Sequence, residues 1–260
     1  MELGPKANRV KIGDRVGVET HIVNWKTRES RTGKAHLCLS AQILGVDRDG
    51  TFAEYAAIPE ENVIPNPASI PDEFLSLEEP LGNAVHAATT VKVPGKRVLV
   101  VGSGPVGLLL ITVLKCFGAA RILVSEINRY RLDLALKVGA DRVINPKETD
   151  LLKVIREETG GEGIDIAFDM SGNDSGINQA IKASKPGGEM VFFGIPKAPV
   201  NINVADDVIF KGLTLYGVVG RRMFETWYEV LDILENKRID LKPIITHRFS
   251  FEEIDRATVG

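Results

Sequence analysis

Cysteine and long apolar runs, the marks of disulfide-stapled and membrane-spanning proteins, are scarce in this sequence. Cys38 and Cys116 are the only cysteines in 260 residues, so we expect no disulfide framework and a reducing, cytoplasmic location. The longest apolar stretch covers residues 106–114, which is too short to cross a bilayer. No apolar signal region follows Met1. We therefore expect no membrane partner.

An excess of charge of one sign is also missing. Lys and Arg number 32 against 35 Asp and Glu, a net charge of −3, which provides no general attraction to nucleic acid. Aromatic residues make up only 6% of the chain, but the hydrophobic share of 44% suits a packed core. The length is enough for one large domain or for one and a half ordinary ones.

A glycine-rich turn is the most informative feature that the sequence does contain. The apolar run 97–101 ends in G-x-G-x-x-G at residues 102–107, where a helical apolar pattern begins. Dinucleotide-binding turns need this strand–turn–helix context. Gly102 would permit the tight turn, Gly104 would let the backbone approach a pyrophosphate, and Gly107 would let the helix pack closely on the strand. Free N–H groups at the helix start would attract the phosphates.

An acidic residue follows the glycine turn at the spacing of a nucleotide site. The strand-like run 121–125 leads to Glu126, about 20 residues beyond the glycines, where a carboxylate accepts hydrogen bonds from the adenosine ribose. Such a carboxylate repels a 2′-phosphate, so the pattern favours NAD over NADP. A solvated carboxylate at a strand end is the alternative. Arg129 and Arg131 leave NADP open, and Arg131 either stacks on adenine or covers the surface.

From residue 97 onward, strand-like and helix-like runs alternate. This alternation predicts an α/β fold with a doubly wound, parallel, six-stranded sheet in the order 3-2-1-4-5-6 and a ligand over the strand ends. The first 80 residues contain short runs broken by Gly, Pro and Asp, at 15–19, 50–58 and 62–64, which indicate irregular β structure. The later strand-like runs are 97–101, 121–125, 142–145, 164–170, 189–194 and 213–219, with helical stretches at 105–117, 129–138, 150–158 and 176–184.

Further motifs are shared with one family of enzymes. They are Val10-Lys-Ile-Gly-Asp-Arg-Val, Gly50-Thr-Phe-Ala-Glu-Tyr-Ala, Glu79-Pro-Leu-Gly-Asn-Ala-Val-His86, Gly220-Arg-Arg-Met-Phe-Glu-Thr-Trp-Tyr228 and Pro243-Ile-Ile-Thr-His-Arg-Phe249. On these motifs and the glycine turn, essentially the whole chain resembles the zinc-dependent medium-chain dehydrogenases. The last three motifs point to members that oxidise L-threonine at C3 with NAD⁺, giving 2-amino-3-oxobutanoate and NADH.

The resemblance implies a domain plan and roles for individual residues. It implies a partial GroES-like catalytic domain at 1–83, a Rossmann NAD-binding domain at 84–246, and a return toward the catalytic domain at 247–260. Glu79 would stand beside the zinc and serve a proton relay, and His21 would position the substrate. The implied NAD contacts are Gly102, Gly104, Val106, Gly107, Glu126, Arg131, Phe193, Gly194, Ile195, Val218 and Val219.

Each of these roles has a plainer alternative. Glu79 precedes a proline and could be a capping or ion-paired carboxylate, and His21 could be an ordinary hydrogen-bonded histidine. Phe193 and Val218 could be core residues at strand ends. Trp227 and Tyr228 are better explained by helix packing than by substrate contact.

The chain departs from the family at both of its zinc sites. The family's catalytic zinc is held mainly by a Cys and a His–Glu pair that lie upstream of the segment resembling residues 1–16. We therefore expect no metal ligand set here, and weak or no activity from these 260 residues by themselves. The family's structural zinc lobe has cysteines spaced C-x-x-C-x-x-C followed by a fourth. The matching residues are Asn24, Thr27, Ser30 and Cys38, which cannot make a tetrahedral thiolate site.

Two other functions stay open at this level. One is a non-catalytic NAD-binding module, and the other is a related dehydrogenase that acts on a polyol or another alcohol. A short natural protein and a piece of a longer enzyme are both compatible with the sequence. The family tends to form homotetramers partly by pairing the sixth strands, for which the run 213–219 could be either an exposed edge or a blunted one.

Overall fold

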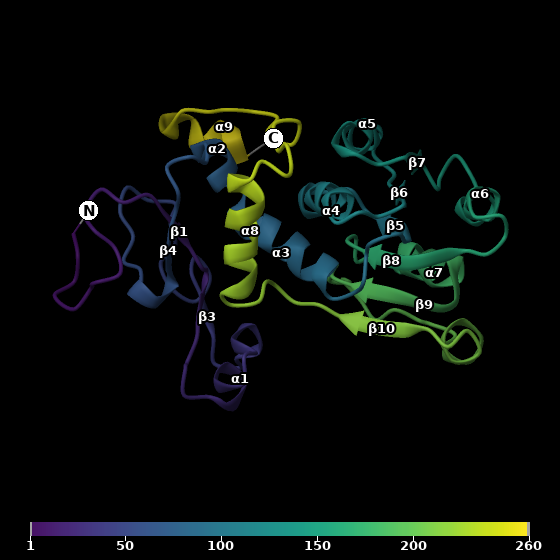
Figure 1. Ribbon diagram of the computed structural model, residues 1–260, viewed down its shortest axis with the longest axis horizontal. Helices are drawn as coiled ribbons and strands as arrows, with labels where there is room; N and C mark the ends of the chain where they lie inside the picture. The colour runs from purple at the N-terminus through teal and green to yellow at the C-terminus, as the bar shows by residue number, and fades with distance from the viewer. Residues whose placement is uncertain (1, 259–260) are drawn as a thin grey trace.

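The larger part of the molecule is built on a six-stranded parallel sheet (Figure 1) in the order β10-β9-β8-β5-β6-β7. The computed structural model describes residues 2–258. Counted along the chain from β5, the order is 3-2-1-4-5-6, which confirms the sequence prediction. The strands are β5 (Arg97–Val101), β6 (Arg121–Ser125), β7 (Arg142–Ile144), β8 (Ile164–Asp169), β9 (Ser184–Phe192) and β10 (Thr214–Gly217).

Helices cover both faces of this sheet, because both faces of its central strands are apolar. All six residues of β8 are buried, as parallel sheets between helix layers require. The crossover helices are α4 (Pro105–Cys116), α5 (Arg129–Val138), α6 (Leu151–Glu158) and α7 (Asp174–Ala183). One hydrophobic core includes residues of α4 and α5, and a second, on the other face, includes residues of α6 and α7.

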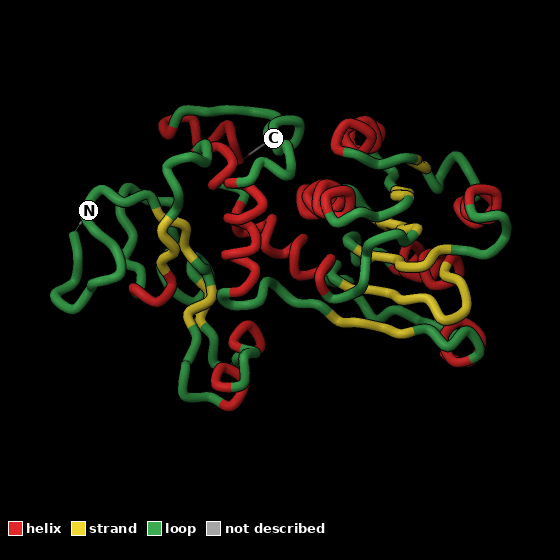
Figure 2. Tube along the Cα trace, viewed as in Figure 1, coloured by secondary structure: helices red, strands yellow, loops and turns green. Residues whose placement is uncertain are grey.

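Two further helices stand between the sheet and the rest of the molecule (Figure 2). They are α3 (Glu78–Thr89) and α8 (Glu225–Glu235), which pack on one another, and α3 also packs on α4. The alternation of the sequence did not indicate α3. The expected domain boundary between residues 83 and 84 falls inside this helix.

The N-terminal part has short strands in two antiparallel pairs. β1 (Val16–Val18) pairs with β4 (Val63–Pro65), and β2 (His21–Ile22) pairs with β3 (Gln42–Ile43). The short helices there are α1 (Arg28–Arg31), η1 (Ala35–Leu37), η2 (Glu60–Asn62) and α2 (Asp72–Leu75), and the remaining ones are η3 (Val204–Ile209), η4 (Phe251–Glu253) and α9 (Ile254–Thr258).

The run 50–58, expected as β structure, forms bends instead of a strand. Its apolar side chains find no buried face, since Phe52 is 90% exposed and Tyr55 is 82% exposed. Alternating apolar residues favour a strand only where one face can be covered, and this run is not covered. Within residues 2–258, no helix is long and apolar enough to span a membrane.

Candidate functional site

The glycine turn joins β5 to α4 with a geometry that only glycine permits at two positions. Gly102 has a φ of +90°, and a Cβ there would lie 2.9 Å from the Cβ of Ser171. A Cβ on Gly107 would lie 2.2 Å from the carbonyl oxygen of Gly102, so this glycine lets the helix approach the strand. A Cβ on Gly104 would meet no atom within 4 Å, which leaves the backbone open to a ligand.

Glu126 ties the end of β6 to this turn. Its carboxylate is 7% exposed and accepts the backbone N–H of Ser103 at 2.9 Å on one oxygen. The other oxygen accepts the N–H groups of Ile127 and Asn128 at 2.8 and 2.9 Å. The Ser103 hydroxyl makes a longer contact of 3.4 Å with the carboxylate. That weakest contact is the one that a ribose hydroxyl could replace.

A cavity of about 640 Å³ opens beside the turn, over the carboxyl ends of β5, β6 and β8. Gly102, Gly104, Glu126 and Arg131 line it, so four of the residues expected to contact a cofactor lie together. The neighbours of β5 are β6 on one side and β8 on the other. The cavity therefore lies at the point where the strand order reverses, which is where open α/β sheets bind ligands.

The other expected cofactor residues lie outside the lining of this cavity, in the first turn of α4 or near the ends of β9 and β10. A Cβ on Gly194 would lie 2.2 Å from the backbone nitrogen of Gly172, so the turns after β8 and β9 pack tightly together. Val106 is half-buried in the first turn of α4. Of the remaining four, Phe193 is partly buried, Ile195 and Val219 are exposed, and Val218 is buried.

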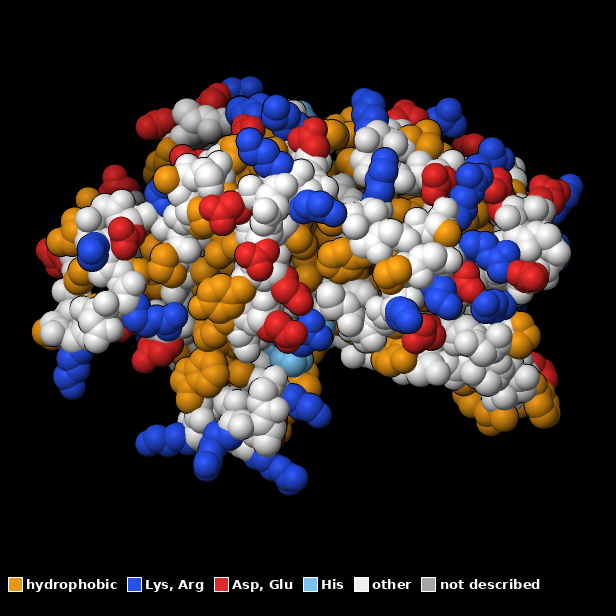
Figure 3. Space-filling model, in the orientation of Figure 1, with side chains coloured by type: hydrophobic (Ala, Val, Ile, Leu, Met, Phe, Trp, Pro, Cys, Tyr) orange, Lys and Arg blue, Asp and Glu red, His pale blue; other side chains and the backbone are white. Residues whose placement is uncertain are grey.

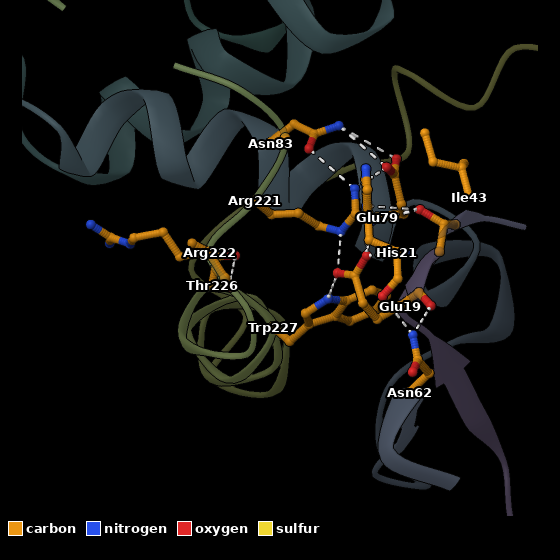
Figure 4. Close-up of polar contacts among 12 residues, drawn as sticks. Glu19, His21, Ile43, Asn62, Glu79, Asn83, Arg221, Arg222, Thr226 and Trp227 are labelled. Atoms are coloured by element: carbon orange, nitrogen blue, oxygen red, sulfur yellow. Dashed lines mark hydrogen bonds and ion pairs between the residues drawn. The ribbon is translucent and has the colours of Figure 1, made fainter. Parts of the chain in front are cut away.

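A buried polar cluster lies between the N-terminal part and α8, centred on Glu19 (Figure 4). Glu19 is completely buried, directly after β1. The Nε–H of Arg221 donates to it at 2.8 Å, and Trp227 Nε1–H donates at 2.7 Å. Arg221 Nη2 adds a second bond to the same carboxylate. Two charges removed from water need such complete pairing.

Arg221 also reaches the start of α3. Its Nη1 forms an ion pair with Glu79 and lies 3.3 Å from the Oδ1 of Asn83. The side chain of Arg221 is 1% exposed and that of Glu79 is 37% exposed. Arg221 thus holds Glu79 at the edge of the cluster, where its carboxylate still faces solvent.

His21 belongs to the same cluster. Its Nδ1 lies 2.9 Å from Glu19 Oε1 and 3.2 Å from Arg221 Nη2. The two Nη2 hydrogens of Arg221 are used on Glu19 and on Thr20 Oγ1. Nδ1 therefore carries the proton and donates it to Glu19, which leaves Nε2 as an acceptor. The His21 ring lies beside Gly220, because a Cβ there would be 3.9 Å from its Cε1.

The electrostatics of the cluster keep Glu19 charged. Burial alone would raise the pKa of Glu19, but the hydrogen bond from His21 and the charge of Arg221 outweigh it and lower that pKa to about 2. The guanidinium also stands 5.7 Å from the centroid of the Trp227 ring. At neutral pH the cluster is therefore an ion pair that orients a histidine.

The structure brings together His21 and Glu79, the two expected catalytic residues, through a third residue that sequence reasoning missed. Arg221 and Glu19 are separated by 202 positions, and no local pattern links them. Trp227 packs in a helix as expected, being 2% exposed, but it also donates to Glu19. Tyr228 is 52% exposed. The one available signal was the pair Arg221–Arg222 in the family-specific motif that also contains Trp227.

A metal site is not formed by the residues described. Within 2–258, no group of three or more His, Cys, Asp or Glu side chains is placed to hold a metal ion. Glu79 is paired with Arg221, and His21 Nδ1 faces Glu19. Zinc sites in enzymes use at least three protein ligands, so these residues alone do not fit zinc.

Two family models match the chain. The model described as alcohol dehydrogenase GroES-like domain matches residues 1–71, and the model described as zinc-binding dehydrogenase matches residues 105–236. The second match begins at Pro105, inside the glycine turn, and includes Glu126. It also covers the six helices α4, α5, α6, α7, η3 and α8. The model boundary leaves α3 outside both matches.

Several curated relatives carry the name L-threonine 3-dehydrogenase. L-threonine 3-dehydrogenase of Caldanaerobacter subterraneus subsp. tengcongensis is 48% identical, over 98% of this chain and 74% of its own length. The protein of that name from Pyrococcus horikoshii is 44% identical, over 99% of this chain and 74% of its own length.

Solved structures share the fold. The 2R,3R-butanediol dehydrogenase of Bacillus subtilis superposes with a TM-score of 0.89 at 29% identity, over 98% of this chain and 72% of that one. A protein of Escherichia coli CFT073 described as a short chain alcohol dehydrogenase complexed with NADH gives a TM-score of 0.91 at 26% identity, over 99% of this chain and 75% of that one.

Proposed function

Because the chain belongs to the zinc-binding dehydrogenase family and is of the L-threonine 3-dehydrogenase type, we propose that it oxidises L-threonine with NAD⁺. The observation that carries the substrate is the identity of 40–48% to several L-threonine 3-dehydrogenases across nearly the whole chain. Members of this family are oxidoreductases for which a nicotinamide cofactor and zinc are expected.

The glycine turn and the cavity beside it support the cofactor. The adenosine half of NAD would lie at Glu126 and Arg131, and the pyrophosphate at Gly104 and the start of α4. The nicotinamide half would lie toward the ends of β9 and β10, at the remaining expected contacts, Phe193, Gly194, Ile195, Val218 and Val219. When bound, NAD⁺ accepts the hydride that leaves the substrate carbon. The NADH complex of the Escherichia coli relative is in keeping with this choice.

The polar cluster supports a proton-transfer role at the other end of the cofactor. His21 is hydrogen-bonded to Glu19 through Nδ1, and its ring lies beside Gly220, three residues after the end of β10. Glu79, whose side chain is 37% exposed, pairs with Nη1 of Arg221, and His21 lies near Nη2 of the same guanidinium. We propose that Glu79 receives the proton of the substrate hydroxyl and passes it to water, while His21 positions the substrate.

We further propose the division of the chain at residues 83 and 246 and a homo-oligomer formed partly through β10. β10 pairs only with β9 among the strands of the described chain, and Leu215 on it is 40% exposed. A small-molecule substrate and a cytoplasmic location complete the proposal.

A substrate panel tests the proposed activity. The protein is purified with zinc and NAD⁺, and NADH formation is followed with L-threonine, sorbitol and 2,3-butanediol. Because the described residues do not form the zinc site, we expect turnover to be weak, with the highest kcat/KM for L-threonine. NAD binding is measured separately by calorimetry on the same sample.

The outcomes separate the candidates. Preference for a polyol or diol would replace the proposal by a related alcohol dehydrogenase. Calorimetric NAD binding with no turnover of any substrate would favour a non-catalytic NAD-binding module. Absence of NAD binding would overturn the assignment of the glycine turn as well.

A further inference from the structure

Residues 24–40 form a small lobe at the place where the family has a structural zinc site. The pairing of β2 with β3 closes its base, through His21 with Ile43 and Ile22 with Gln42. The lobe projects from the N-terminal part, and Figure 3 shows Lys and Arg side chains gathered at its tip. The resemblance matches its residues Asn24, Thr27, Ser30 and Cys38 to four zinc-binding cysteines.

Three of the four matched side chains converge in space, and the fourth residue, Asn24, reaches the Cys38 sulfur through its backbone. The hydroxyl of Thr27 lies 3.1 Å from that of Ser30 and 3.8 Å from the sulfur of Cys38. The Ser40 hydroxyl lies 3.5 Å from the same sulfur. Its hydrogen bond, with one from the backbone of Asn24, lowers the pKa of the Cys38 thiol to about 7 against the opposing effect of burial.

One of the spacings equals that between two ligands of a tetrahedral thiolate site. A Zn–S bond of about 2.3 Å places two sulfurs of a tetrahedron roughly 3.8 Å apart. Thr27 Oγ1 and Cys38 Sγ stand 3.8 Å apart. The chemistry of the set is nevertheless wrong for zinc, because it comprises one thiol, two hydroxyls and one amide. Neutral hydroxyls are poor ligands for this ion compared with thiolates.

Contacts other than a metal hold the lobe on the body of the molecule. The Trp25 ring packs on Phe224, just before α8, with centroids 6.0 Å apart. The His36 ring meets His86 of α3 edge-on at 5.2 Å. The interior is buried without an ion, since Ser30 is 8% exposed and Cys38 is 7% exposed.

We propose that this lobe is a metal-free replacement of a zinc site, in which hydrogen bonds among Thr27, Ser30 and Cys38 hold the positions that thiolates would take around the ion. The lobe keeps its fold and its docking on α3 and α8 without zinc. The matched residues lie close together, but three of them lack the thiol that binds zinc. Replacing Asn24, Thr27 and Ser30 by Cys should therefore create a metal site.

The first test uses the unaltered chain. Hydrogen exchange across residues 24–40 is compared before and after treatment with a zinc chelator, with the metal content measured in both samples. We expect the same protection in both. Loss of protection on chelation, with release of a metal that the Cys38→Ser variant does not hold, would overturn the proposal.

The second test restores the thiolates. The variant carrying Asn24→Cys, Thr27→Cys and Ser30→Cys is titrated with Co²⁺ and then Zn²⁺, and the visible absorption of tetrahedral thiolate-bound Co²⁺ is recorded. We expect about one ion per chain, no such absorption in the unaltered chain, and its loss when Cys38→Ser is added. NAD binding at the distant glycine turn reports that the variant is folded. A folded variant without the thiolate spectrum would show that the four positions do not converge.

Discussion

The glycine turn and the Glu19 cluster are built by opposite means. At the turn, the carboxylate of Glu126 reaches a backbone N–H only 23 positions away, and the surrounding contacts are mostly to backbone. In the cluster, Glu19 and Arg221 come from positions 202 apart and meet through charged side chains. The difference shows that one site is specified by a local motif, whereas the other exists only after the two parts of the chain have docked.

The largest expected effect is on the long-range cluster. Replacing Arg221 by Met leaves Glu19 charged and buried with its ion-pair partner missing, which typically costs about 3–5 kcal/mol. We expect a loss of that size in the free energy of unfolding, measured in urea. The cofactor cavity shares none of these contacts, so the NAD affinity of the folded fraction should change much less.

Two controls sharpen this prediction. Arg238 is exposed, and Arg238→Met should change the free energy of unfolding by no more than about 0.5 kcal/mol. Adding Glu19→Gln to Arg221→Met removes the stranded charge and should recover part of the loss. A cost below about 1 kcal/mol for Arg221→Met would show that the cluster is not the element that joins the two parts.

The next effect separates packing from ligand contact within the glycine turn. Gly107→Ala places a Cβ against the Gly102 carbonyl, so we expect about 1–3 kcal/mol lower stability together with weaker NAD binding. Gly104→Ala meets no neighbouring atom and should leave the thermal midpoint unchanged while weakening NAD binding. Equal effects of the two substitutions on stability would contradict the roles assigned to these glycines.

Glu126→Ala tests the ribose contact directly. We expect NAD binding to weaken by roughly 1–3 kcal/mol, as for loss of a charged hydrogen-bond partner, and discrimination against NADP to diminish. Ser103→Ala is the matched control, because it removes only the long contacts of the Ser103 hydroxyl, at 3.4 Å to Glu126 and 3.5 Å to the Arg131 carbonyl. Its NAD affinity, measured by calorimetry, should stay within about twofold. Unchanged NAD affinity in Glu126→Ala would mean that this carboxylate only accepts hydrogen bonds from the surrounding backbone and does not contact the ribose.

The parts of the molecule that could be predicted from the sequence are those whose cause is local. Strands 97–101 and 121–125 and the helix at 129–138 agree with the structure at both ends, because apolar period and glycine punctuation define them. The run 50–58 did not form a strand, since no local signal reports whether a partner covers it. The sequence pattern did not indicate helix α3, because Pro80 and Gly82 lie within it and both residues usually mark turns.

The polar cluster illustrates the same limit for function. His21 and Glu79 were expected as site residues only because a family resemblance named them. Their common partner Arg221 lies in a quoted motif, but a charge that is 1% exposed cannot be told from a surface charge by spacing. Burial of a charge is a property of the docked fold, and the sequence does not display it.

The smallest expected effect concerns the lobe of residues 24–40, because its contact with α3 is made by two histidines, His36 and His86. Burial, together with the charges of His86 and Arg222, lowers the pKa of His36 to about 4, and burial also lowers the pKa of His86. The side chains of Arg222, His21 and Lys34 disfavour protonation of His36. Arg222 acts in the same way on His86, where Glu225 opposes it. Both rings are therefore neutral in the docked lobe at pH 7.

The direction of the pH effect follows from these shifts. In the undocked lobe His36 has its ordinary pKa of 6.5, whereas in the docked lobe its pKa is about 4. Protonation of His36 therefore favours the undocked lobe, and docking weakens as the pH falls through this window. Glu19 stays charged there because its pKa is about 2. Glu78 acts in the opposite sense, since burial raises its pKa to about 7, and stability linked to it is lost as pH rises.

Hydrogen exchange over residues 24–40, corrected for the pH dependence of intrinsic exchange, can isolate the lobe from the rest. Protection should fall between pH 7 and pH 5 in the unaltered chain. His36→Phe keeps an aromatic ring against His86 but cannot take up a proton, so its protection should fall less. If both proteins lose protection equally, the titration of His36 does not control docking, and the long-range apolar contact of Trp25 with Phe224 is the better explanation of what holds the lobe.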